Sequence, residues 1–310
     1  MSNFLLIFIA LGFGALMGKL KLLPRDAYKG VNAWLIYLVL PAVSLRFVPE
    51  IEWSTAMLLP LLAPAAIWGG AWVFVRLCDR KLHLSAASRT ALLITCGLGN
   101  TGFFGFPMIT AFYGGEHIHD GVVFDQTTFL IFATLGVIAI LKAAQGSPDA
   151  TGGSPGFLFV LGRVLRFPPF VGCLLALILP HFMDIEIVNP LLDKLVATMS
   201  PMSLFSIGLQ LRVGGIREEW RLLTAGLCYK LLLAPVLVTL LALAIHPVGV
   251  LPILPKISVF QAAMPSHVTA SLLASQYNHN PRYCSLAVGL GILSGFATCT
   301  LWYFILERLF

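Results

Sequence analysis

The sequence predicts an all-α polytopic membrane protein with ten transmembrane helices, arranged as a 5+5 inverted repeat in which the crossover helices 4 and 9 are broken. Three observations predict this fold. The 310 residues are 58% hydrophobic and 11% charged, whereas soluble domains carry about 25% charged residues. Ten apolar segments approach the ~20 residues that a helix needs to cross a bilayer. Proline and glycine interrupt corresponding segments of the two halves.

Short connections that carry proline, glycine or charge separate the ten apolar segments. The first segment has no basic n-region and no cleavage site, so we interpret it as a membrane helix rather than a signal peptide. The longest polar break, residues 143–155, separates five segments from five. We therefore expect a first repeat at residues 1–145, a short cytoplasmic linker at 146–155 and a second, inverted repeat at 156–310. The expected helices cover residues 3–20, 30–48, 55–77, 88–113, 121–142, 157–181, 190–211, 221–245, 253–277 and 283–307.

The basic residues indicate how the chain is oriented in the membrane. Of 20 lysine and arginine residues, fifteen fall on one side of the ten-span arrangement and four on the other, while Lys230 lies within a span. Loops rich in lysine and arginine stay in the cytoplasm. We therefore expect a multi-pass protein of a bacterial inner (plasma) membrane with both termini periplasmic. The formal net charge of +6 then reflects orientation and not nucleic-acid binding.

Matching prolines indicate that the two halves share one fold. Pro41 and Pro201 lie in spans 2 and 7, and Pro107 and Pro265 follow them by 66 and 64 residues in spans 4 and 9. Because five spans per half is an odd number, equivalent halves must have opposite orientation. Paired broken helices in inverted repeats mark the substrate site of many secondary transporters.

Span 4 contains the strongest break signal, in the stretch Thr95–Pro107. Four glycines and a proline fall within these thirteen residues, at a cost of about 1 kcal/mol for each helical glycine and about 3 for proline. We expect two half-helices separated by extended backbone near Asn100. Non-helical backbone at membrane depth must be buried in protein or line a watery cavity. A simple kink against a neighbouring helix is the alternative for this span alone, and the matching break in span 9 favours a functional site.

Polar residues accompany both breaks. The N-terminus of a half-helix has free N–H groups and a partial positive charge, which suit an anion. Asn100 and Thr101 add donors at the first break, and Ser266, His267 and Thr269 add polar groups at the second. Asn100 could instead cap the freed backbone. His267 could carry a coupled proton or act as a neutral hydrogen-bonding residue.

Charged residues inside spans are the candidates for coupling or gating. Lys230 lies nine residues after Arg221, roughly 14 Å into span 8, where a charge indicates function by default. The alternative is that its long side chain reaches the membrane interface. Asp125 and Gln126 in span 5 are the nearest candidate ligands for a coupling ion. Asp125 could instead lie in the outer headgroup layer.

The sequence gives no indication of catalysis. It contains no G-x-S-x-G, no H-E-x-x-H and no Walker-type phosphate loop. An outer loop contains His117 and His119. Two histidines alone are weak evidence for a metal site. We therefore expect a protein that is not an enzyme and that needs no cofactor and no metal.

Several of these motifs together resemble the auxin efflux carrier family over nearly the whole chain. Plant members export auxin, and bacterial members are thought to carry malonate, malate and related anions. The matching stretches are Asn32 with Pro41–Phe47, Leu98–Thr101 with Gly105–Pro107, Phe205–Leu209, Lys230 with Pro235, Gln261–Pro265 and Gln276–Asn278.

This resemblance implies an architecture related to the bile acid sodium symporters. Spans 1, 2, 6 and 7 would form a scaffold and the contact of a homodimer, and spans 3–5 and 8–10 would move past it as an elevator. Asn100 would bind the substrate carboxylate, and Pro107 and Pro265 would mark the crossover. Taken with the polar residues at the two breaks, the predicted substrate-binding residues are Asn100, Thr101, Gly99, Pro107, Gln261, Pro265, Ser266 and His267. The scaffold side would contribute Asn32, Pro41, Ser44 and Pro201.

Three departures from the plant members bear on the substrate and the coupling ion. Phe167–Phe170 replaces polar residues of their sixth helix, their long central loop is reduced to a short linker, and residues 55–75 contain no counterpart of their charged pair. We expect a secondary transporter of a small organic anion, a mono- or dicarboxylate such as malonate or malate or an auxin-like acid, with protons or sodium as open coupling partners. The rivals are a sodium-coupled symporter of the bile-acid type and a membrane sensor that binds the anion without moving it, although a sensor would normally carry a soluble output domain.

Overall fold

The computed structural model describes residues 2–24, 26–51, 53–145, 161–162, 164–211, 216–245 and 252–309. Within these ranges the regular structure is helical, apart from one isolated β-bridge. The predicted linker at 146–155 lies outside the described residues. The prediction of an all-α protein is therefore confirmed for the part of the chain that the structure covers.

The first half of the chain contains the helices of spans 1 to 5. Its α-helices are α1 (Ser2–Leu20), α2 (Ala27–Trp34), α3 (Leu40–Phe47), α4 (Leu58–Leu82), α5 (Ala86–Gly97), α6 (Phe106–Phe112), α7 (Ile118–Ile131) and α8 (Val137–Gln145). The π-helical turns are η1 (Leu35–Val39), η4 (Thr101–Gly105) and η6 (Phe132–Gly136), and the 3-10 turns are η2 (Val48–Glu50), η3 (Thr55–Met57) and η5 (Gly115–His117).

The second half of the chain is also built from long, short and interrupted helices. Its α-helices are α10 (Pro168–Ile178), α11 (Asn189–Ala197), α12 (Met199–Gln210), α13 (Ile216–Cys228), α14 (Ala234–Ile245), α15 (Ile253–Ala262), α16 (Val268–Gln276) and α17 (Pro281–Leu309). The π-helical turn η9 covers Tyr229–Leu233, and the 3-10 turns are η7 (Leu179–His181) and η8 (Glu186–Val188). Each of the ten predicted segments thus contains helix.

Five continuous helices in the described ranges are long and apolar enough to cross a membrane. They are Ala27–Glu50, Thr55–Leu82, Gly115–Ala144, Ile216–Ile245 and Pro281–Arg308. Phe4–Leu20, Thr101–Phe112 and Pro168–His181 are shorter apolar helices. The number and length of these helices indicate a multi-pass membrane protein.

Three of the π-helical turns end two residues before a proline. These are η1 before Pro41, η4 before Pro107 and η9 before Pro235. Proline donates no hydrogen bond, and its ring clashes with the carbonyl four residues earlier in a regular α-helix. The wider π turn changes the local hydrogen-bond pattern, so the chain passes each proline without ending the helix.

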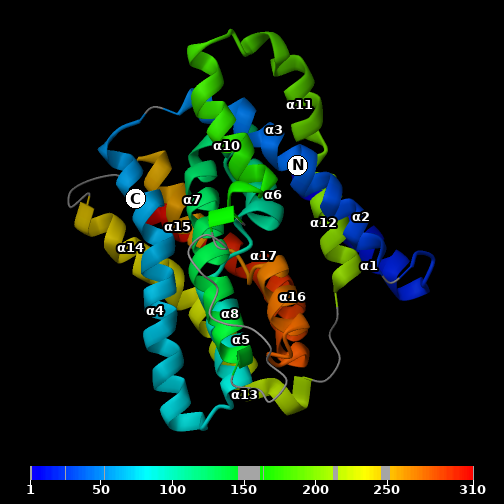
Figure 1. The fold of residues 1–310 in the computed structure, drawn as a ribbon, viewed down its shortest axis with the longest axis vertical. Helices are drawn as coiled ribbons and strands as arrows, with labels where there is room; N and C mark the ends of the chain where they lie inside the picture. The colour runs from blue at the N-terminus through cyan, green and yellow to red at the C-terminus, as the bar shows by residue number, and fades with distance from the viewer. Residues whose placement is uncertain are drawn as a thin grey trace.

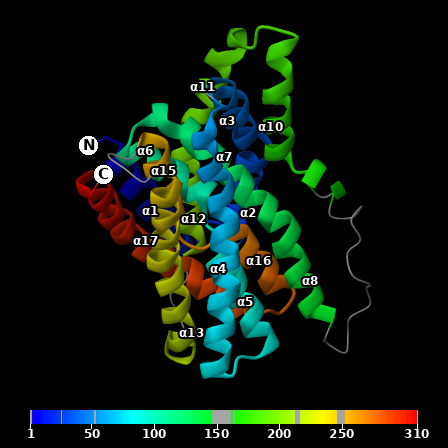
Figure 2. The same cartoon turned by 90° about the vertical axis from the view of Figure 1, so that its left-hand side faces the viewer.

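The helices pack into two groups (Figures 1 and 2). In the first, α1 packs against α12, α2 packs against α12, and α3 packs against α10 and α11. Glycines permit close approach here: a Cβ at Gly14 would collide with the carbonyl of Phe205, and one at Gly172 would lie 2.6 Å from the Cα atom of Pro41. In the second group, α4 packs against α5, α7 and α14, while α17 packs against α13 and α16.

The two interrupted helices cross at their breaks. Helix α5 ends at Gly97 and η4 begins at Thr101, while α15 ends at Ala262 and α16 begins at Val268. Gly99 and Ser266 form an antiparallel bridge between the two extended segments. The Asn100 N–H donates to the Pro265 carbonyl at 2.7 Å, and the His267 N–H donates to the Leu98 carbonyl at 3.0 Å. Each break therefore supplies partners for backbone groups that the other leaves unpaired.

Candidate functional site

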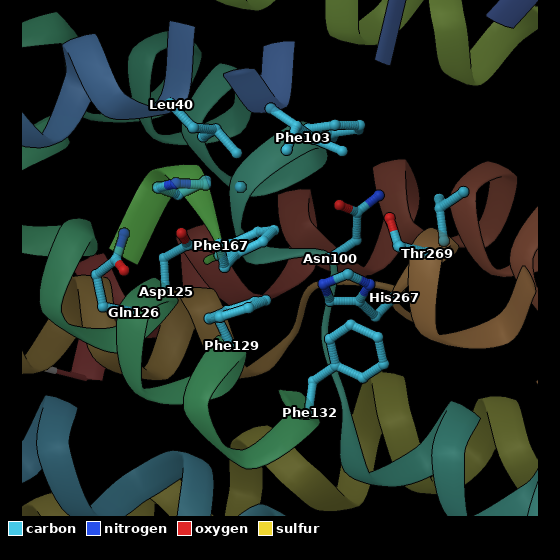
Figure 3. Close-up of a pocket in the computed structure, with 14 residues that line it drawn as sticks. Leu40, Asn100, Phe103, Asp125, Gln126, Phe129, Phe132, Phe167, His267 and Thr269 are labelled. Atoms are coloured by element: carbon cyan, nitrogen blue, oxygen red, sulfur yellow. The ribbon is translucent and has the colours of Figure 1, made fainter. Parts of the chain in front are cut away.

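A pocket lies beside this crossover, between the two groups of helices (Figure 3). It encloses about 560 Å³ of empty space, part of it open to solvent. Residues from η1, α3, η4, α7, η6, α10 and α16, with the residues preceding α10 and α16, surround it. They are Ile36, Leu40, Asn100, Gly102, Phe103, Asp125, Gln126, Phe129, Phe132, Phe167, Pro169, His267, Val268 and Thr269.

Asn100 places an unused donor in this pocket. Its side chain is 4% exposed, and its Nδ2 atom has no hydrogen-bond partner among the described residues. Asn100 precedes η4, but its side chain makes no capping hydrogen bond there; only its backbone bridges the break. Leaving a buried donor unpaired costs about 1–3 kcal/mol, so this amide group is suited to a ligand.

The N-terminus of α16 faces the same pocket. His267 caps this helix, because its Nδ1 atom accepts a hydrogen bond from the Ala270 N–H at 3.2 Å. In a neutral ring the proton must then be on Nε2, which makes Nε2–H a donor. Val268 and Thr269, the first residues of the helix, line the pocket, and N–H groups at this position have no partner within the helix. These groups place hydrogen-bond donors on one side of the pocket, and donors of this kind suit an anion.

Acceptor oxygens lie on the opposite side of the pocket, on α7 (Figure 3). Asp125 is half-buried, and its Oδ1 atom accepts a hydrogen bond from the Thr101 hydroxyl at 2.6 Å. The Oε1 atom of Gln126 is buried and has no partner among the described residues. The structure therefore brings Asp125 and Gln126 together with three polar residues predicted at the breaks, which are Asn100, His267 and Thr269.

Aromatic side chains form much of the remaining wall, and the sequence did not identify them as site residues. The rings of Phe129 and Phe167 stack with centroids 3.5 Å apart and an interplanar angle of 10°. The Phe132 ring lies 5.3 Å from the His267 ring. In a membrane helix a phenylalanine that faces lipid and one that faces a pocket look alike in the sequence. Only Phe167 had a signal, because it belongs to the segment that replaces polar residues of the plant family members.

The other residues predicted at the breaks stabilise the crossover and do not line the pocket. The Ser266 hydroxyl donates to the Thr95 carbonyl at 2.9 Å. The Gln261 amide donates to the Thr101 carbonyl at 3.4 Å. Gly99 and Pro265 take part through their backbones, and Pro107 is buried in the first turn of α6.

Lys230 is buried beneath the crossover, and its side chain does not extend to the protein surface. Its side chain is 1% exposed, and its Nζ atom donates to the Ala262 carbonyl at 2.8 Å. Ala262 is the last residue of α15, where carbonyl groups are unpaired and the helix carries a partial negative charge. A Cβ at Gly99 would lie 3.1 Å from the same Nζ atom. Lys230 therefore holds the end of one half-helix against the extended segment of the other.

The residues predicted on the scaffold side lie mostly away from the pocket. The Asn32 side chain accepts a hydrogen bond from the Ser206 hydroxyl at 2.5 Å and so connects α2 to α12. Pro41 contacts Gly172, and Pro201 lies in the first turns of α12. Ser44 adjoins the site, because its hydroxyl accepts a hydrogen bond from the Gln126 amide at 3.5 Å.

Crossed half-helices, a pocket beside them and several helices long and apolar enough to span a membrane are typical of membrane transport proteins. The comparisons with known proteins agree: the model of the membrane transport protein family matches residues 2–147 and 157–303. The chain therefore belongs to this family, the auxin efflux carrier family that its motifs resemble.

Two curated relatives are similar over most of their length. An uncharacterized transporter of Methanothermobacter thermautotrophicus is 22% identical over 229 residues, which cover 73% of this chain and 71% of the relative. An uncharacterized transporter of Methanocaldococcus jannaschii is 21% identical over 321 residues, which cover 97% and 96% of the two chains. Both relatives are described as transporters, and neither description names a substrate.

Proposed function

We propose that this protein is a secondary transporter that moves a small organic anion, a mono- or dicarboxylate, across the membrane by elevator-type alternating access. The observation that carries the proposal is the buried Asn100 amide, without a partner among the described residues, in a pocket that also receives the N-terminus of α16. Amides and helix N-termini bind a carboxylate without a full positive charge. Such binding is compatible with release on the other side of the membrane.

Membrane topology is part of the proposal. We infer ten spans in two inverted repeats, since each predicted segment contains helix and the two interrupted ones cross. The start of α1 and the end of α17 lie toward the same end of the molecule, away from the α4–α5 turn (Figures 1 and 2). An even number of spans requires this arrangement. The excess of basic residues on the other side supports periplasmic termini in a bacterial inner membrane.

The packing of the helices supports a division into a scaffold and a moving domain. Helices α1, α2, α3, α10, α11 and α12 would form the scaffold and the contact of a homodimer. The crossover lies in the other group and would move with it. The pocket contains residues of both groups, including Leu40 and Phe167 from the scaffold and His267 from the moving domain. An elevator needs its site at such a boundary, because movement of one group then changes which side of the membrane the site faces.

Uptake into liposomes by the purified protein tests the proposal. Labelled malonate, malate, a monocarboxylate and indole acetate are supplied with and without an imposed proton or sodium gradient. We expect uptake of at least one of these anions. Asn100→Ala should lower this uptake at least about tenfold, since losing a hydrogen bond to a charged group costs about 1.5–3 kcal/mol.

Two further variants make the test specific. Asn100→Asp has nearly the same shape but places a negative charge beside the anion, so it should reduce uptake more than Asn100→Ala. Asn189→Ala in α11 lies outside the pocket and should leave uptake unchanged. Binding of an anion without any uptake would contradict transport and favour the sensor. Unchanged uptake by Asn100→Ala would remove Asn100 from the site.

A further inference from the structure

The pocket has two chemically opposite sides. Asn100, His267 and the first turn of α16 present donors on one side, and Asp125 and Gln126 present acceptor oxygens on the other (Figure 3). A site for an anion alone needs only the donor side. Binding of an anion therefore does not account for the acceptor oxygens of Asp125 and Gln126.

The orientation of the Gln126 amide follows from its neighbour. The Ser44 hydroxyl donates to the Leu40 carbonyl at 3.2 Å, so towards Gln126 it acts as an acceptor. The Gln126 Nε2 atom donates to it at 3.5 Å. This leaves the Oε1 atom of Gln126, which is 9% exposed as a residue, as a buried acceptor without a partner among the described residues. An unpaired acceptor beside a carboxylate is suited to a positively charged partner.

The Asp125 carboxylate has one hydrogen-bond donor and no cationic partner among the described residues. Thr101 supplies the donor, and Gly102 lets the carboxylate approach η4 closely, since a Cβ there would lie 3.2 Å from Oδ1. No described lysine or arginine forms an ion pair with Asp125. The charge of this carboxylate is therefore not balanced by the protein around it.

The groups that face Asp125 from neighbouring elements are mostly neutral. Ile36 of η1 and Leu40 of α3 are apolar, as are Phe167 and Pro169 near the start of α10. The titratable groups nearby are the Cys173 thiol of α10 and the His267 ring across the pocket. An anion that enters the donor side thus shares a partly water-excluded pocket with the Asp125 carboxyl group. Whenever that group is ionised, the two negative charges repel each other.

We propose that Asp125 and Gln126 form a cation subsite, so that the pocket loads an anion together with one positive charge. That charge is a proton on Asp125, a sodium ion held by the α7 oxygens, or the ammonium group of a zwitterionic substrate. All three satisfy the same acceptor side and remove the repulsion. The role of the subsite in transport rests on the proposed transport function. Binding of the cation at the subsite can be tested without transport.

Binding to the purified full-length protein tests the subsite and distinguishes the three cations. The probes are labelled malate and its amino analogue aspartate, together with malonate and indole acetate. Each probe is titrated over a range of pH, in sodium buffer and in buffer in which an organic cation replaces sodium. Asp125→Asn removes the charge but keeps an acceptor for Thr101. Asp26→Asn is the control, because Asp26 is an exposed residue outside the pocket.

The expected result is one cation dependence that Asp125→Asn abolishes. With a proton, the Kd of the anion rises about tenfold per pH unit above the titration of the carboxyl group. With sodium, the Kd falls as sodium is added. With an ammonium group, aspartate binds at least about tenfold more tightly than malate, as expected for a charge pair in a partly buried site. In Asp125→Asn the dependence disappears, while Asp26→Asn behaves as the wild type.

Two results would overturn the proposal. One is anion binding that is indifferent to pH, sodium and the amino group. The other is a dependence that persists in Asp125→Asn; a persistent dependence on pH would belong to His267. Cation-dependent binding without uptake into liposomes would contradict the transport function alone. If the folded protein bound none of the probes, both proposals would fail.

Discussion

Asn100 and Lys230 both adjoin the crossover, but only Asn100 lines the pocket. The sequence identified each as polar at membrane depth, and it could not distinguish a ligand-binding role from a structural one. In the structure, the hydrogen-bond partners of the two side chains distinguish these roles. The Asn100 amide has no partner among the described residues, whereas the Lys230 ammonium has one in the Ala262 carbonyl.

Replacing Lys230 by methionine should therefore affect stability more than binding. The Ala262 carbonyl would lose its donor, at a cost of about 1–3 kcal/mol, and the end of α15 would lose a favourable charge. We expect a lower midpoint of thermal unfolding and an anion Kd within about twofold of wild type, since 1.4 kcal/mol corresponds to tenfold. Lys230→Arg should retain most of the stability. Normal stability with abolished transport would show instead that Lys230 acts in gating.

At the scale of elements, the close packing of α1 against α12 depends on two glycines. A Cβ at Gly208 would collide with the backbone of Leu11 and Ala15, and one at Gly14 would lie 3.2 Å from the Cα atom of Gly208. Small residues let membrane helices approach closely and gain van der Waals contact. Gly12 lies in the same helix and has nothing within 4 Å of the corresponding position.

These glycines provide a matched set of variants. Gly14→Ala and Gly208→Ala should each destabilise the protein by about 1–3 kcal/mol, the usual cost of overpacking. Gly12→Ala should be neutral or stabilise it by up to about 1 kcal/mol, since alanine favours helix. Thermal unfolding of the three variants in the same detergent checks this. Equal effects at all three positions would contradict a tight contact between α1 and α12.

The interruptions of α5 and α15 show which features of the elements are predictable. Glycine and proline act on their own backbone, so their local cost marks the break in the sequence. Contacts between residues that are far apart in the sequence leave no such local signal. The Ala262 carbonyl lies 32 residues from Lys230, and Phe129 and Phe167 stack from different helices. Breaks were therefore predictable, and the pocket walls were not.

At the scale of the whole molecule, length alone identifies only half of the predicted spans. Five continuous helices in the described ranges satisfy it, because the others are interrupted or short. Broken helices are long enough only when their halves are added together. The prediction of ten spans therefore rests on the alternation of basic loops and on the matching prolines.

A reporter placed at two positions tests the topology. A fusion after Phe310 should be active only as a periplasmic reporter, and an insertion within residues 146–155 only as a cytoplasmic one. The reason is the distribution of basic residues, fifteen on one side against four on the other. Cytoplasmic activity of the fusion after Phe310 would contradict an even number of spans with an external N-terminus.

The paired backbones at the crossover have a consequence for how such proteins diverge. The donor side of the pocket includes the first turn of α16, whose main-chain N–H groups have no partner within the helix and are carried by every residue except proline. Substitutions can then accumulate around the pocket while these N–H groups, which would bind the proposed anion, stay in place. Relatives that are only 21–22% identical to this chain could therefore retain a common anchoring point. The side chains that face these N–H groups would then determine which anion binds. Substrate specificity could change through those side chains while the fold stays the same.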